Sequence, residues 1–124
     1  MDSQQIRHIL ARASFGIVFA GFGIWEILQP SYWSFYVPSF VAGMIGIDLF
    51  VELHGMALLL IGLAVMLGVY LRISASLGAL MMALIIGDLV YLSGFSDIVL
   101  RDMALLLIAL SLAFDDTPFL RLRR

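Results

Sequence analysis

Residues 51–92, VELHGMALLLIGLAVMLGVYLRISASLGALMMALIIGDLVYL, decide how the chain is expected to fold. Almost all of them are apolar, and Glu52, Arg72 and Asp88 are the only formally charged side chains among them. One continuous helix would be about 60 Å long at about 1.5 Å per residue, about twice the thickness of a membrane's hydrocarbon layer. The stretch therefore predicts two membrane-crossing helices, at about 51–71 and 73–92, with the bend at Arg72.

The composition of the whole chain favours a membrane protein. Of its 124 residues, 63% are hydrophobic and 13% are charged, and the mean hydropathy is +1.09. This is far from the balance of a soluble domain. Two further apolar runs, at about 9–28 and 98–114, complete a set of four expected spans. We expect an all-α fold, an integral membrane four-helix bundle formed by one domain over residues 1–124.

The segment between the first two spans is aromatic rather than evenly apolar. Residues 30–40, PSYWSFYVPSF, contain five aromatic side chains and two prolines. Pro30 disfavours helix in the residue before it, so the first span is expected to end there. Tryptophan and tyrosine are enriched at the surfaces of membranes. The segment is therefore predicted to lie at the membrane interface.

The arginines are distributed unevenly between the two expected sides of the membrane. With four spans, both termini and the region of residue 72 share one side. That side collects Arg7, Arg12, Arg72, Arg121, Arg123 and Arg124, and only Arg101 is expected opposite. Because basic residues mark the cytoplasmic side, both termini are predicted to be cytoplasmic. The N-terminal segment has the layout of a signal peptide, but its apolar run is long, and we interpret it as a retained first span.

Acidic side chains gather near the expected outer ends of the spans. Ionisable groups at membrane depth are costly and usually face a partner or a cavity. We therefore predict an outer polar cluster in which Arg101 is the only cation expected to pair with Asp88. Its members are Glu26, Glu52, Asp88 and Arg101, with Asp48, His54 and Asp102 as possible neighbours. Structural ion pairs and side chains that reach from span ends to the interface explain the same residues equally well.

The stretch DLFVELHG, residues 48–55, resembles a metal or proton site at first reading. On a helix Asp48 and Glu52 share a face, whereas Glu52 and His54 point roughly 200° apart. A metal site that uses Glu52 and His54 together is therefore not expected. Glu52 also fits the first turn of a helix, where a carboxylate is favoured. His54 is interpreted as a bystander unless a neighbouring chain supplies its partner.

Small residues recur at helical spacing in the first three spans, which allows helices to approach closely. They are Gly16, Ala20 and Gly23 in the first span, Gly55 and Gly62 in the second, and Ser76, Ala79, Ala83 and Gly87 in the third. Arg12 continues the first stripe. Its side chain is expected either to reach the cytoplasmic interface or to be held inward against a carbonyl-bearing ligand or a helix C-terminus.

The residues that usually hold cofactors are scarce. The chain has no cysteine, and its two histidines, His8 and His54, are expected at opposite ends of the bundle. A haem held by two histidines of one chain is therefore improbable, and no phosphate-binding loop or HExxH motif is present. We expect no metal and no covalently bound cofactor.

Three segments together resemble the DoxX-like family of small four-helix membrane proteins. They are RASFGIVFAGFGIWEIL at 12–28, VELHGMALLLIGLAVMLGVYLR at 51–72 and VLRDMALLLIALSL at 99–112. The resemblance implies a four-helix bundle in the cell membrane of a prokaryote, and some relatives are linked to thiosulfate:quinone oxidoreductase. Glu26 departs from the pattern, because many relatives carry a lysine near this place.

Three functions are compatible with these features. The first is a non-catalytic subunit or accessory protein of a membrane complex, respiratory or redox in character, with a lipid or quinone groove. The second is the quinone-reactive small subunit that the resemblance implies, in which the outer carboxylates pass protons. The third is transport of a small solute or ion. The expected partners are membrane lipids and other membrane subunits or further copies of the chain, and nucleic acid is not expected.

Overall fold

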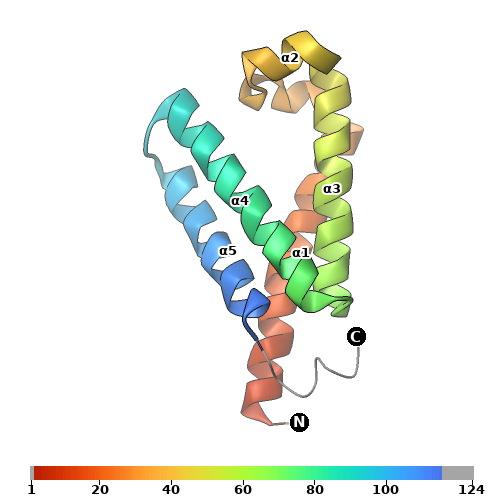
Figure 1. Cartoon of the computed structure of the whole chain (residues 1–124), viewed down its shortest axis with the longest axis vertical. Helices are drawn as coiled ribbons and strands as arrows, with labels where there is room; N and C mark the ends of the chain where they lie inside the picture. Colours follow the sequence, from red (N-terminus) through yellow and green to blue (C-terminus); the bar gives the residue numbers. More distant parts are fainter. Residues whose placement is uncertain (1, 116–124) are drawn as a thin grey trace.

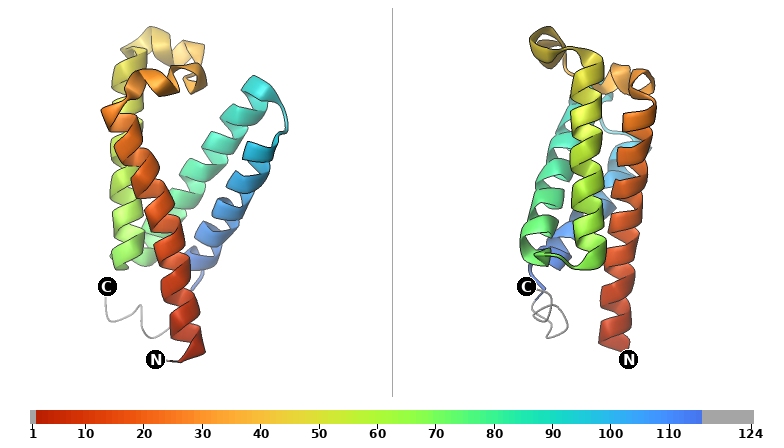
Figure 2. Two further views of the ribbon diagram at one scale, coloured as in Figure 1. Left: turned by 180° about the vertical axis from the view of Figure 1, so that it is seen from behind. Right: turned by 90° about the vertical axis from the view of Figure 1, so that its right-hand side faces the viewer.

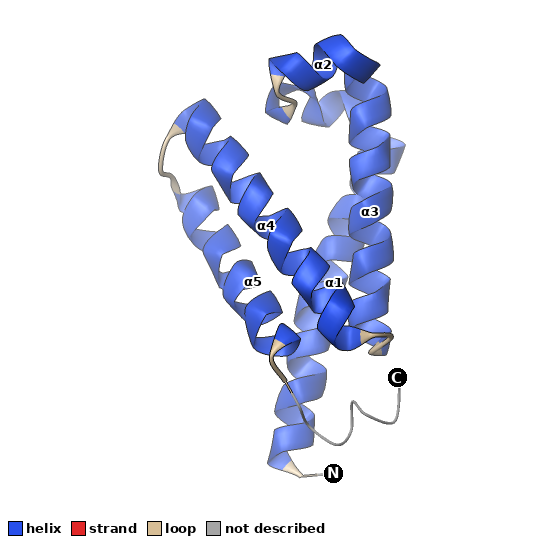
Figure 3. Ribbon diagram, in the orientation of Figure 1, coloured by secondary structure: helices blue, strands red, loops and turns tan. Residues whose placement is uncertain are grey.

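The computed structural model of the chain describes residues 2–115, and the regular elements in this range are all helical (Figures 1 and 3). In chain order they are α1 (Ser3–Leu28), the 3-10 helix η1 (Pro30–Tyr36), α2 (Ser39–Ile45), α3 (Ile47–Leu67), α4 (Leu71–Ser93) and α5 (Asp97–Ala113). The prediction of an all-α chain is confirmed. Arg121, Arg123 and Arg124, which entered the prediction of topology, lie outside the described residues.

Three of the helices, α1, α3 and α4, are long and apolar enough to cross a membrane. Each exceeds the roughly 17 residues that the thinnest hydrocarbon layer requires, so the chain is a multi-pass membrane protein. The run predicted as a fourth span coincides with α5, which has 17 residues. That α5 also crosses the membrane stays a prediction.

The first helix begins earlier than predicted because the polar residues before its apolar run form a helix cap. The Oδ1 atom of Asp2 accepts a hydrogen bond of 2.8 Å from the backbone N–H of Gln5. In return, the Oε1 atom of Gln5 accepts one of 3.1 Å from the backbone N–H of Asp2. This reciprocal arrangement satisfies two backbone groups that the first turn leaves without helical partners. As a result α1 is 26 residues long.

The turn between α3 and α4 lies before the position that the sequence indicated. The bend was expected at Arg72, but α3 ends at Leu67 and α4 begins at Leu71. Gly68 ends α3 with φ +75°, and Tyr70 also has a positive φ of 43°. A left-handed residue cannot continue a helix, and glycine adopts this conformation at little cost. Gly68 is therefore the residue that separates the two spans.

The long helices form two pairs, α1 with α3 and α4 with α5. Figures 1 and 2 show that the pairs converge at one end of the molecule and diverge at the other. The end where they converge contains the start of α1, the turn at 68–70 and the end of α5, and we call it the Arg12 end. The other end contains η1, α2 and the loop at 94–96, and we call it the aromatic end.

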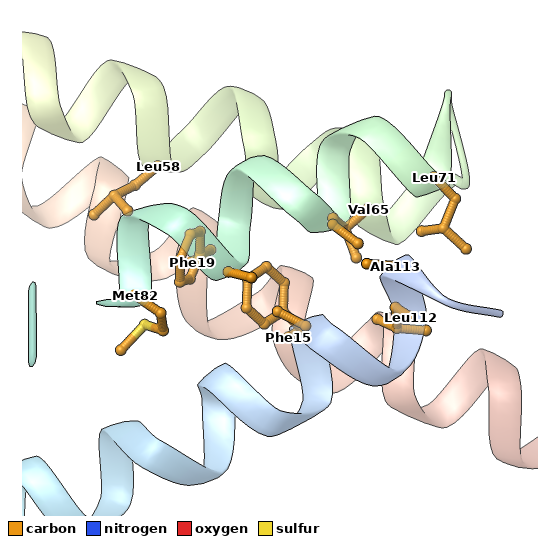
Figure 4. Close-up of a cluster of buried hydrophobic side chains, with 11 residues drawn as sticks. Phe15, Phe19, Leu58, Val65, Leu71, Met82, Leu112 and Ala113 are labelled. Carbon is orange, nitrogen blue, oxygen red and sulfur yellow. The ribbon is translucent and has the colours of Figure 1, made fainter. Parts of the chain in front are cut away.

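The buried core lies where the two pairs meet (Figure 4). Phe15 and Phe19 of α1 occupy its centre, with ring centroids 4.2 Å apart. Gly78 of α4 makes room for them, since a Cβ atom there would lie 2.6 Å from the Phe15 ring. The other large members are Leu58, Val65, Leu71, Met82 and Leu112. Burial at this site therefore joins all four long helices.

Glycines bring α1 and α3 into backbone contact. A Cβ atom at Gly16 would lie 2.7 Å from the carbonyl oxygen of Gly62, and one at Gly23 would lie 2.6 Å from that of Gly55. From the other side, a Cβ atom at Gly62 would lie 2.7 Å from the backbone nitrogen of Ala20. No side chain fits at these points unless a helix shifts. The contacts therefore set the register of α1 along α3.

The small residues predicted to form a stripe on α4 are placed differently. Ala79 is buried, but Ser76, Ala83 and Gly87 are exposed. A Cβ atom at Gly87 would meet nothing within 4 Å. Of this predicted packing stripe on α4, only Ala79 is therefore buried in the described bundle.

Aromatic rings from α1 and η1 form a cluster at the aromatic end. The Trp33 ring lies edge-on to Trp25, at a centroid distance of 5.1 Å, and to Phe22, at 5.6 Å. Tyr32 stacks on Trp25 at 4.9 Å, and Tyr36 lies 5.9 Å from Trp33. We call these five residues the aromatic cluster. Its edge-on and offset contacts are those that aromatic pairs prefer.

Candidate functional site

A carboxylate and an imidazole from two different helices meet at the aromatic end. The Nδ1 atom of His54, on α3, lies 2.7 Å from the Oε1 atom of Glu26, on α1. A carboxylate only accepts hydrogen bonds, so the imidazole N–H is the donor when Glu26 is ionised. The Glu26 side chain is 8% exposed and that of His54 is 24% exposed. We call these two residues the Glu26–His54 pair.

The glycine contacts between α1 and α3 explain why these two residues meet. Glu26 is three positions after Gly23, and His54 directly precedes Gly55. Gly23 and Gly55 touch each other, and a Cβ atom at Gly55 would lie 2.9 Å from the Cβ of Glu26. Glu26 therefore crosses the interface beside Gly55, where no side chain blocks its path.

Two further side chains complete the surroundings of His54. The Phe50 ring, one helical turn earlier on α3, stacks on the imidazole at a centroid distance of 5.9 Å. Asp88 of α4 is half-buried and interacts electrostatically with His54. Two carboxylates from other helices, Glu26 and Asp88, therefore interact with His54. Glu26, His54 and Asp88 form the candidate site.

His54 thus has a partner within its own chain, which corrects its interpretation as a bystander. Glu52 and His54 point in different directions around α3, as their helical spacing predicted, because Glu52 is exposed while His54 is half-buried. The missing information was the register between α1 and α3. Without it, a histidine and a glutamate 28 residues apart cannot be paired from the sequence.

The remaining members of the predicted outer cluster do not join the site. Glu52, Arg101 and Asp48 have exposed side chains. Asp102 is half-buried and interacts with Arg101, its neighbour in the chain. Within residues 2–115 no ion pair joins Asp88 to Arg101, so the expected pairing of these two is corrected.

Arg12 forms the main polar contact at the opposite end of the bundle. Its Nε atom donates a hydrogen bond of 3.2 Å to the carbonyl oxygen of Val65, and its Nη2 atom donates one of 2.8 Å to that of Met66. These carbonyls belong to the last turn of α3, where a helix presents partial negative charge. Of the two expected roles, Arg12 therefore has the inward one, against a helix C-terminus. A Cβ atom at Gly68 would lie 2.8 Å from the Arg12 guanidinium.

A second histidine pair also lies at the Arg12 end. The Nδ1 atom of His8 is 2.6 Å from the Oδ2 atom of Asp115, which follows α5. The His8 side chain is only 3% exposed. This contact connects the start of α1 to the end of α5, and it adds to the core contacts that hold the two helix pairs together. Apart from the two residue types, no feature of the sequence indicated this contact.

Comparison of the chain with protein-family models, with curated proteins and with solved structures finds no match. The chemistry of the site is therefore considered from its own residues. Within the described part of the chain, no three histidine, cysteine, aspartate or glutamate side chains are grouped so that they could hold a metal ion. A carboxylate that is hydrogen-bonded to an imidazole can hold or pass a proton. The two groups can also form hydrogen bonds with a polar group of a ligand.

Proposed function

We propose that the chain is a small integral membrane subunit or accessory protein of a membrane complex with a respiratory or other redox function. In this proposal, the aromatic end holds a quinone or a lipid headgroup beside the Glu26–His54 pair. The observation that carries the proposal is the contact between a buried Glu26 and a half-buried His54 on two membrane-length helices, with Glu26 next in sequence to Trp25 of the aromatic cluster.

The chemistry of the aromatic end suits a flat ligand with carbonyl oxygens. Ligand sites are mostly apolar and contain a few polar groups that fix orientation. Here the rings of the aromatic cluster provide flat apolar surfaces, and the Glu26–His54 pair provides polar atoms one residue along α1 from Trp25. The resemblance of three sequence segments to the DoxX-like family supports a quinone rather than a soluble metabolite.

The exposed apolar side chains on the outside of the helix bundle support the role of a subunit. Large apolar side chains such as Leu60 of α3 and Leu84 of α4 are exposed to 62% and 65%. In a membrane this surface contacts lipid tails or another subunit. Ala83 and Gly87, which face away from the bundle, would allow a helix of another subunit or of a second copy to approach α4 closely.

The proposed location is the cell membrane of a prokaryote, with four spans and both termini in the cytoplasm. The absence of cysteine makes this testable by single-cysteine labelling in intact cells. Ser39→Cys and Ser96→Cys should react with a membrane-impermeant maleimide, whereas Ser3→Cys and Arg124→Cys should react only after permeabilisation. Reaction of Arg124→Cys in intact cells would show that α5 does not cross.

Co-purification tests the proposed function. The tagged chain, extracted from native membranes in a mild detergent, should retain specific membrane proteins and a quinone identified by mass spectrometry. His54→Gln should reduce the retained quinone, whereas Glu52→Gln, whose side chain is exposed two residues away, should not. A monomer that carries neither protein nor quinone would contradict the proposal.

A further inference from the structure

The two ring nitrogens of His54 have different surroundings. Nδ1 is bonded to Glu26, and within residues 2–115 the other nitrogen, Nε2, has no hydrogen-bond partner. The side chain is 24% exposed, three times as much as that of Glu26. The imidazole therefore lies between a buried carboxylate and the surface of the aromatic end. An imidazole in this position can accept a proton at one nitrogen and release one from the other.

Glu26 depends on His54 for polar contact. In the described part of the chain, His54 is the only hydrogen-bond partner of the Glu26 carboxyl group. The carboxyl group lies inside the contact between α1 and α3, beside Gly55. A proton that reaches it from the medium must cross this packed interface or pass through the ring that touches it.

The described ionisable groups around His54 are carboxylates and tyrosines. Of the helices that contact α3, α1 contributes Glu26, which bonds to His54, and α4 contributes Asp88, which interacts with His54 electrostatically. The short helix α2 has no ionisable side chain, and η1 contributes only two tyrosines. On α3 itself, Asp48 and Glu52 are exposed carboxylates. None of these groups is a cation, so a transient imidazolium meets no like charge there.

We propose that His54 shuttles protons between the outer medium and Glu26. A hydronium ion of the medium gives its proton to Nε2: an O–H bond breaks, an N–H bond forms, and a water molecule and an imidazolium result. The N–H bond at Nδ1 then breaks, and its proton forms an O–H bond on Oε1 of Glu26. The result is a neutral carboxyl group and a neutral imidazole that carries its proton on Nε2. After Glu26 has given up its proton, loss of the Nε2 proton to water and gain of one at Nδ1 restore the starting tautomer.

The shuttle would make Glu26 a proton-loading site inside the membrane protein. A partner that takes up protons, such as a reduced quinone intermediate, would receive them from Glu26. The inference itself does not depend on the identity of any ligand or partner, because the proton transfer involves only water and two side chains of this chain. Its failure would therefore leave the proposed role as a membrane subunit untouched.

Time-resolved infrared spectroscopy tests the shuttle on the full chain in lipid bilayers. After a rapid step from about pH 8 to about pH 3, which crosses the ordinary pKa values of histidine and glutamate, the C=O band of protonated carboxyl groups should appear. The part of this band that Glu26→Gln lacks reports Glu26, since other carboxyl groups protonate over the same step. In His54→Ala it should form at least about 10-fold more slowly, since a positioned acid–base group usually contributes at least that much. Imidazole added to the medium should restore the rate, because position 54 is partly exposed.

The control variant is Glu52→Gln, which removes an exposed carboxylate from the same helix and should leave the rate unchanged. Equal rates in the unmodified chain and in His54→Ala would overturn the proposal, as would a slow rate that imidazole does not restore. If His54→Ala does not fold, nitrogen NMR of the unmodified chain decides. Proton exchange with water at Nε2 faster than at Nδ1 supports the shuttle, and an Nε2 that never gains a proton refutes it.

Discussion

The contact between Gly23 and α3 provides the sharpest prediction about stability. A Cβ atom at residue 23 would lie 2.6 Å from the carbonyl oxygen of Gly55 and 2.6 Å from the backbone nitrogen of Leu59. Ordinary contact begins at 3.4 Å, so α1 must move about 0.8 Å away from α3 to accept alanine. A gap of that size forfeits about a quarter to a half of each affected dispersion contact.

The matched control for Gly23→Ala is Gly21→Ala. Gly21 is on the same helix, two residues away, and a Cβ atom there would meet nothing within 4 Å. Both variants gain the preference of alanine over glycine for helix, about 1 kcal/mol. The difference between them is therefore the cost of overpacking, about 1–3 kcal/mol.

The assay is unfolding of the detergent-solubilised protein by increasing mole fractions of dodecyl sulfate, followed by circular dichroism. Gly23→Ala should unfold at a lower mole fraction than the unmodified chain, and Gly21→Ala at the same or a higher one. If Gly23→Ala is as stable as Gly21→Ala, then α1 and α3 are not in backbone contact and the prediction is wrong.

Three further substitutions test the polar contacts by the same unfolding assay. Arg12→Gln should lower the free energy of unfolding by about 2–3 kcal/mol, because two charge-assisted bonds to the end of α3 are lost. Glu26→Gln and His54→Gln, made singly and together, should show a coupling energy of about 1–3 kcal/mol, since the two groups touch. The effects of Asp88→Asn and Arg101→Gln on the free energy of unfolding should instead be additive to within about 0.5 kcal/mol, since no ion pair joins the two residues in the described structure.

Exposed charges provide the controls for these substitutions. Arg7→Gln removes an exposed arginine from α1, and Glu52→Gln removes an exposed glutamate from α3. Each should change the free energy of unfolding by no more than about 0.5 kcal/mol. Equal losses in Arg12→Gln and Arg7→Gln would contradict the assignment of Arg12 as a cap of α3. A coupling energy above about 1 kcal/mol between Asp88 and Arg101 would restore the predicted pair.

Hydropathy was sufficient to predict the long helices but not their ends. The apolar run at 51–92 is too long for one span, and the chain divides it into α3 and α4. Hydropathy did not locate the turn, because Gly68 is as compatible with an apolar run as with a helix end. Its role depends on a positive φ, a property of the backbone that leaves no trace in the average polarity.

The candidate site could be predicted only in part, for a related reason. The distance of a residue from the end of a span gives an expected depth in the membrane, which is why the sequence grouped Glu26, Glu52 and Asp88. Depth does not say which way a side chain points around the helix. The direction follows from the contact of Gly23 with Gly55, which turns Glu26 toward α3 and leaves Glu52 exposed. Spacing alone identified these glycines without showing which helices they join.

Both proposals rest on the Glu26–His54 contact, which a distance measurement can check without any assay of function. The chain has two glutamates and two histidines, so ¹³C-labelled glutamate carboxyl groups and ¹⁵N-labelled histidine give few possible pairs. Solid-state NMR dipolar recoupling in lipid bilayers should show strong dephasing between the Glu26 carboxyl carbon and His54 Nδ1, as the 2.7 Å N···O contact requires. The signal should disappear in Glu26→Gln and persist in Glu52→Gln. Absence of dephasing in the unmodified chain would contradict the account.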